Sequence, residues 1–167
     1  MVSSKIKTND IEDKLKNWLS NAQKVVIAGI GNPLRKDDSV GVEIVRKLRN
    51  KVSPSVYLIE CETVPESFIE SITEFKPTHI LIIDAALLTI DLGSSKLIEP
   101  GQMMKQTAIS THALPLQIFC EYLAKTTSAK IALLLIQPKD TDFGEGLTAE
   151  LRKTAVKLTN LLSKILP

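Results

Sequence analysis

The hydrophobic residues of this chain fall into two patterns that alternate along its length. Short, continuous apolar runs predict buried strands at 24–30, 56–59, 79–84 and 130–136, with a short edge strand at 96–98. Apolar residues at helical spacing predict helices that begin near residue 10, at 39–50, at 68–75, around Pro115 and from about residue 148. Strands that alternate with helices favour an α/β fold, namely three α/β/α layers around a mostly parallel sheet with one short edge strand.

The segment between the first predicted strand and the helix at 39–50 carries the most informative residues. It reads Gly29-Ile30-Gly31-Asn32-Pro33-Leu34-Arg35-Lys36-Asp37-Asp38-Ser39-Val40-Gly41. Its first two glycines match the start of a dinucleotide-binding loop, but Leu34 stands where the third glycine is needed. The adjacent carboxylates of Asp37 and Asp38 would repel a phosphate and suit a cation. One of them is equally explained as a helix N-cap, which leaves the other without an explanation.

Three polar side chains are expected at one edge of the sheet, where ligands of open α/β sheets bind. Asp38 precedes a helix, Asp84 ends a strand, and His112 opens the helix before the last strand. Two carboxylates and one imidazole form a borderline ligand set for a divalent transition ion, with coordination positions left open. Each residue also has an ordinary interpretation, Asp84 as a turn residue and His112 as a solvated side chain. His79, at the start of a strand, is expected at the surface.

Composition and charge narrow the class of protein. The chain of 167 residues suffices for one α/β domain, taken as residues 1–167, in which residues 1–23 form an N-terminal extension with a helix. The net charge of +2 comes from interspersed acidic and basic residues, so we expect no nucleic-acid partner and no membrane insertion. The first residues lack the apolar core of a signal peptide. Cys61 and Cys120 lack zinc-binding spacing, which indicates reduced thiols in a cytoplasmic protein.

Several short motifs follow one another in order from about residue 24 onward. They are Gly29-x-Gly31-Asn32-x-x-x-x-Asp37-Asp38-x-x-Gly41, Lys76-Pro77-Thr78, Ile82-Ile83-Asp84-Ala85, Ser110-Thr111-His112-Ala113-Leu114-Pro115-Leu116 and Leu135-Ile136-Gln137-Pro138. In this order they resemble the nickel–iron hydrogenase maturation endopeptidases. The Thr-His-x-x-Pro-Leu and Ile-Gln-Pro elements resemble the branch that acts on formate-hydrogenlyase-type (hydrogenase 3) hydrogenases.

The resemblance implies an endopeptidase that removes the C-terminal extension of a nickel–iron hydrogenase large-subunit precursor after nickel insertion. It implies that Asp38, Asp84 and His112 bind nickel supplied by the precursor, and we expect no tightly bound metal in the free enzyme. The sequence departs from the family at Glu60-Cys61-Glu62, where many relatives carry a glycine pair. This departure could add a carboxylate to the substrate cleft.

The expected reaction is hydrolysis of an amide bond, of aspartic type or metal-assisted, and two mechanisms stay open. The substrate's nickel could polarise the scissile carbonyl or activate water, or Asp38, ahead of Asp84, could act as the general base. No serine or cysteine nucleophile is indicated. A protein of another class, a non-catalytic nickel-dependent chaperone or binding module for the large subunit, is the alternative. A nucleotide-binding domain is disfavoured by the missing third glycine.

Overall fold

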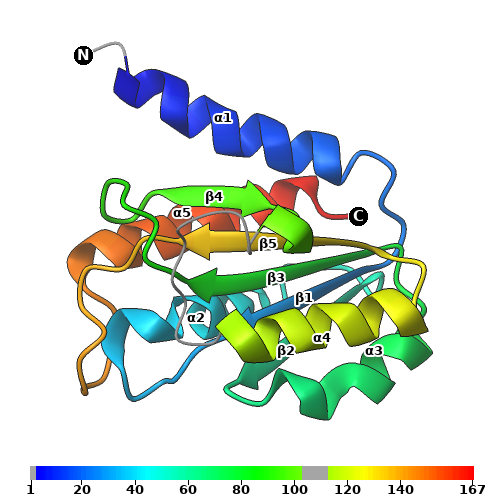
Figure 1. The fold of residues 1–167 in the computed structure, drawn as a ribbon. Helices are drawn as coiled ribbons and strands as arrows, with labels where there is room; N and C mark the ends of the chain where they lie inside the picture. The colour runs from blue at the N-terminus through cyan, green and yellow to red at the C-terminus, as the bar shows by residue number, and fades with distance from the viewer. Residues whose placement is uncertain (1–2, 103–112) are drawn as a thin grey trace.

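Five strands form one sheet at the centre of the computed structural model, which describes residues 3–102 and 113–167 (Figure 1). They are β1 (Val25–Ile30), β2 (Val56–Glu62), β3 (His79–Ala85), β4 (Ser95–Ile98) and β5 (Lys130–Ile136). The strand order is β2-β1-β3-β5-β4, in which all neighbours are parallel except the short edge strand β4, which is antiparallel to β5. The predicted fold class, including the edge strand, is confirmed.

Helices cover both faces of this sheet and complete the three layers. They are α1 (Ser3–Trp18), α2 (Val40–Leu48), α3 (Ile69–Phe75), α4 (Ala113–Thr126) and α5 (Ala149–Ile165). Buried residues of α1, α2 and α5 share one hydrophobic cluster with the sheet, whereas α3 and α4 pack on the opposite face. Three short 3-10 turns, Lys36–Ser39, Pro65–Phe68 and Pro100–Gln102, complete the regular structure. Within the described residues, no helix combines the length and apolar character needed to cross a membrane.

The central strands are apolar because side chains on both of their faces are buried. In β1, Val25 and Ile27 belong to the cluster on the α2 and α5 side, while Val26 and Ala28 belong to the cluster on the α3 and α4 side. Every residue of β3 is buried. This two-sided burial explains why these strands read as continuous apolar runs instead of alternating patterns.

The structure corrects two details of the prediction near the N-terminal end of the sheet. Helix α1 begins at Ser3 and not near residue 10, since a helix anchored by Ile11 and Leu15 gains one hydrogen bond for each residue added. The expectation of a surface position for His79 is wrong, because His79 is only 3% exposed. The ring of Trp18 packs edge-on against it, with centroids 5.0 Å apart, and burial lowers the pKa of His79.

Candidate active site

Two glycines let helix α2 approach the sheet more closely than side chains would allow. A Cβ atom at Gly29 in β1 would overlap the carbonyl oxygen of Gly41 and lie 2.9 Å from the Val45 side chain. A Cβ atom at Gly41 would overlap the carbonyl oxygen of Ile83 and lie 2.7 Å from that of Ile30. The start of α2 therefore rests directly on the carboxyl ends of β1 and β3, the edge at which the sequence predicts the site.

Asp38 lies in the 3-10 turn that leads into α2, and it is only 5% exposed. Its Oδ2 atom accepts a hydrogen bond from the backbone N–H of Asn32 at 2.9 Å. Gly31 packs against the backbone carbonyl of Asp38 and has a φ of +141°, a conformation and a contact that exclude any side chain. The turn after β1 therefore fixes the carboxylate of Asp38 at the end of that strand.

Asp84 lies next to the end of β3 and is fully buried. Its Oδ1 atom accepts a hydrogen bond from the backbone N–H of Ala85 at 2.9 Å. The strand register pairs Gly29 with Ile83, so Asp84 lies just beyond the last β1–β3 pair. Because Gly41 packs on Ile83, and Asp38 precedes Gly41 by about one helical turn, both aspartates lie at the carboxyl ends of neighbouring strands.

The third predicted ligand, His112, lies outside the described residues, so its place beside the aspartates stays a prediction. Helix α4 begins at the next residue, Ala113, and ends at Thr126, close to the start of β5 at Lys130. It therefore runs opposite to the parallel strands, and its start lies at their carboxyl edge (Figure 1).

The donor chemistry of the two aspartates suits a divalent ion, although they supply only part of a ligand set. Among residues 3–102 and 113–167, no group of three or more His, Cys, Asp or Glu side chains is arranged to hold a metal ion. Carboxylate oxygens combine with imidazole nitrogen in sites for first-row transition ions. Because Asp38 and Asp84 are almost fully buried, a cation between them would experience a low dielectric constant, in which charge interactions are stronger than in water.

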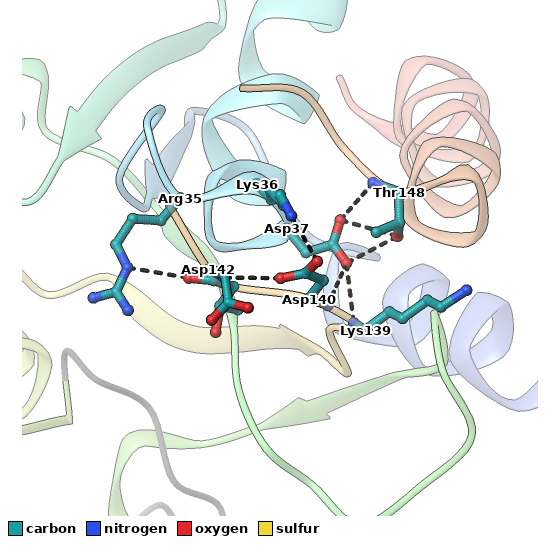
Figure 2. A network of polar contacts seen from close by, with 8 residues as sticks. Arg35, Lys36, Asp37, Lys139, Asp140, Asp142 and Thr148 are labelled. Atoms are coloured by element: carbon teal, nitrogen blue, oxygen red, sulfur yellow. Dashed lines mark hydrogen bonds and ion pairs between the residues drawn. The ribbon is translucent and has the colours of Figure 1, made fainter. Parts of the chain in front are cut away.

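Asp37 has a role that the sequence did not reveal. This fully buried carboxylate accepts hydrogen bonds from the N–H of Thr148 at 2.7 Å, from the Thr148 hydroxyl, and from the N–H groups of Lys139 and Asp140 at 3.0 Å each (Figure 2). It thereby joins the loop before α2 to the loop between β5 and α5. The N-cap interpretation is wrong, because the N-cap of α2 is Ser39 and no side-chain hydrogen bond caps that helix.

The segment that departs from the family pattern is built into the structure of the sheet. Glu60 accepts hydrogen bonds from the guanidinium groups of Arg46 and Arg49, so its carboxylate is tied to α2 and the residue that follows it. The backbone carbonyl of Glu62 accepts a hydrogen bond from the N–H of Gly31 at 2.8 Å. Between them, Cys61 is the extra residue of a β-bulge and is fully buried. The charge of Glu60 therefore stabilises the packing of α2 against β2.

Both cysteines are free, as predicted from their spacing, and both are buried. Burial raises the pKa of the Cys61 thiol and of the Cys120 thiol to about 12 in each case. A thiol with such a pKa is almost entirely protonated at neutral pH and is a poor nucleophile. Neither cysteine is therefore a candidate for nucleophilic catalysis.

The fold and the two aspartates define an open α/β protein with buried carboxylates at the ligand-binding edge of its sheet. A family model described as hydrogenase maturation protease matches residues 42–165, a range that includes Asp84. A protein of Methanocaldococcus jannaschii that carries a provisional hydrogenase maturation protease name is 40% identical over 164 residues, which cover 93% of this chain and 96% of that protein. The chain belongs to the hydrogenase maturation protease family.

Two other relatives agree with this assignment. The hydrogenase 3 maturation protease of Escherichia coli K12 is 27% identical over 127 residues, or 76% of this chain and 81% of that protein. The crystal structure of the NiFe hydrogenase maturation protease HycI from Thermococcus kodakarensis KOD1 superimposes with a TM-score of 0.85 at 32% identity. The superposition covers 92% of this chain and 98% of that one.

Proposed function

We propose that this chain is an endopeptidase that removes the C-terminal extension of a nickel–iron hydrogenase large-subunit precursor after nickel has been inserted. The observation that carries the proposal is the position of the buried Asp38 and Asp84 at the carboxyl ends of β1 and β3, in a chain of the hydrogenase maturation protease family. The similarity to the hydrogenase 3 maturation protease of Escherichia coli supports a precursor of the formate-hydrogenlyase type. We propose the cytoplasm as the place of the reaction.

In this proposal the precursor brings the metal to the enzyme. Nickel held by the precursor gains ligands from Asp38, Asp84 and His112, and this contact orients the scissile amide bond. The ion polarises the carbonyl group that water attacks. A carboxylate, Asp38 in the first place, accepts a proton from that water, and the leaving nitrogen is protonated as the C–N bond breaks. Because Cys61 and Cys120 are buried and protonated, water is the nucleophile.

The first test compares nickel-loaded with nickel-free precursor, each mixed with the purified protein. We expect cleavage of the loaded precursor, detected as the loss of a C-terminal fragment by mass spectrometry, and no cleavage of the nickel-free form at any enzyme concentration. Treating the enzyme alone with a chelator, followed by its removal, should leave this activity unchanged, because the metal belongs to the substrate. Stoichiometric zinc in the isolated protein, with activity lost on stripping, would instead identify an ordinary metalloprotease.

The second test replaces Asp38 by Asn. The amide oxygen still accepts the hydrogen bond from the N–H of Asn32, so the free energy of unfolding should fall by no more than about 1 kcal/mol. The negative charge that would bind nickel or accept the proton is removed, so processing should be lost. The Asp13→Asn protein, changed at an exposed position on α1, is the matched control and should cleave the precursor normally.

The alternative function has its own outcome in these tests. A folded wild-type protein that binds nickel-loaded precursor and never cleaves it would be a chaperone.

A further inference from the structure

Two exposed apolar residues occupy neighbouring backbone positions on the loop that carries Asp38 and on the loop paired with it. Leu34, in the loop after β1, is 48% exposed, and Phe143, in the loop after β5, is 82% exposed. Their loops pair through a parallel bridge between Arg35 and Gly144. The N–H of Gly144 donates to the carbonyl of Leu34 at 2.8 Å, and the N–H of Lys36 donates to the carbonyl of Gly144 at 3.0 Å. In this register Leu34 and Phe143 are neighbours across the two backbones.

Hydrogen bonds hold these two loops in one conformation. The buried carboxylate of Asp37 binds the second loop at residues 139, 140 and 148, and the backbone N–H of Asp37 donates to the carbonyl of Asp140 at 3.0 Å (Figure 2). The Nε atom of Arg35 donates to the carbonyl of Thr141 at 3.1 Å. Because the backbone of these loops is already fixed, a partner that covers the two exposed apolar residues does not have to order the loops.

The lysines of the two loops are already paired within the chain. Lys36 contacts Asp140 at 2.8 Å, and Lys139 contacts Glu150 at the same distance. These contacts raise the pKa of Lys36 and lower that of Asp140, which is the effect of opposite charges in direct contact. Since both lysines are paired within the chain, the uncompensated feature on which we focus is the pair of exposed apolar residues.

We propose that Leu34 and Phe143 form a docking platform for an apolar segment of the hydrogenase large-subunit precursor. The inference rests on the proposed function and adds a surface that selects the substrate. We choose the precursor as the partner because the platform is part of the same turn as the candidate site. The backbone N–H of Asp38 donates to the carbonyl of Arg35 at 3.0 Å, and the carboxylate of Asp38 binds Asn32, so Leu34 belongs to the same turn as Asp38. A chain segment bound on the platform therefore lies beside the carboxylate that acts on it.

The test measures binding and cleavage separately, with nickel-loaded precursor as the probe. The variants are Phe143→Ser and Leu34→Ser, singly and together, and Tyr122→Ser is the matched control because Tyr122 is a 55% exposed aromatic residue on α4. Biolayer interferometry gives the Kd for immobilised precursor, and initial rates give kcat and KM. We expect Phe143→Ser to raise Kd and KM by at least about tenfold, as aromatic anchors of interfaces do, with kcat changed less than about threefold.

The outcomes test the platform and the proposed function separately. If the wild type cleaves the precursor and the double variant has an unchanged Kd and KM, the platform is refuted while the protease function stands. If the wild type binds without cleaving, and Phe143→Ser weakens that binding, the platform holds and the catalytic proposal fails. Equal weakening by Tyr122→Ser would contradict a local platform. Light scattering that shows a wild-type dimer and a monomeric Phe143→Ser protein would assign this surface to a second copy of the chain and overturn the proposal.

Discussion

Replacing Thr148 by Val should reveal how strongly the buried Asp37 carboxylate ties the two loops together. The Thr148 hydroxyl lies 3.0 and 2.9 Å from the two oxygens of Asp37, and valine puts a methyl group of similar size in its place. Thr148 is the N-cap residue of α5, but its side chain makes no capping hydrogen bond, so the substitution does not remove a helix cap. Both residues are β-branched, which keeps the backbone preference nearly constant. The change is therefore confined to the hydrogen bond with Asp37.

The magnitude follows from the surroundings of the carboxylate. A hydrogen bond to a charged group contributes about 1.5–3 kcal/mol to stability, so Thr148→Val should lower the free energy of unfolding by that amount. Thr148→Ser keeps the hydroxyl and should cost less than about 1 kcal/mol. Asp37→Asn should cost more than Thr148→Val, at least about 3 kcal/mol. Both oxygens of Asp37 accept backbone N–H groups, so an amide nitrogen at either position would face a donor.

Urea denaturation followed by circular dichroism measures these differences, with a constant m-value as the sign that the unfolded states are comparable. In a chain of 167 residues, each kcal/mol should shift the melting temperature by about 2–4 °C. Equal stability of the Thr148→Val and Thr148→Ser proteins would refute this role of Thr148, because the bond to Asp37 would then contribute nothing.

Three further predictions concern other parts of the fold. Gly41→Ala should destabilise the protein by about 1–3 kcal/mol in the same assay, although alanine normally favours a helix, because its Cβ atom would overlap the carbonyl oxygen of Ile83. Because the pKa of His79 is lowered in the folded protein, the unfolded state binds a proton at this residue first as the pH falls. The free energy of unfolding should therefore decrease below about pH 6.5, by at most about 1.4 kcal/mol per pH unit, and level off below the folded pKa. The His79→Phe protein should lack this part of the pH dependence. Cys61 and Cys120, with thiol pKa values of about 12, should react with iodoacetamide at pH 7.5 only after denaturation, as mass spectrometry will show.

Much of the fold was predictable because its strands are buried on both faces. A parallel strand covered by helices needs apolar side chains throughout, and such a run stands out in the sequence without any knowledge of its partners. The glycines of the first motif were also visible, and the structure gives a steric reason for Gly29 in β1 and Gly41 in α2. The position of Asp38 and Asp84 at the carboxyl ends of strands follows from the order of strands and helices along the chain. Their joint action on nickel, together with His112, stays a prediction.

The features that the sequence missed depend on contacts between distant segments. His79 begins its strand after polar residues, which suggested exposure, but Trp18 of α1 covers it. Asp37 looked like a spare acidic residue next to Asp38, because its partners lie more than a hundred positions away. No local spacing rule describes such a contact, and neighbouring residues suggested only a helix cap or a cation site. Long-range hydrogen bonds of this kind become visible only when the chain is folded.

The two adjacent aspartates show how the fold divides structural and chemical tasks. The oxygens of Asp37 are occupied by backbone and hydroxyl donors of the chain, a state in which a carboxylate stabilises structure and has little capacity left for a substrate. Asp38, the next residue, is fixed by the turn after β1, and the preceding residues Lys36 and Asp37 bind the loop between β5 and α5. Substitutions in the loop between β5 and α5 should therefore affect the candidate site in two ways. Those that disturb the donors to Asp37 should move Asp38 and lower kcat, whereas a change at Phe143 should act on precursor binding alone.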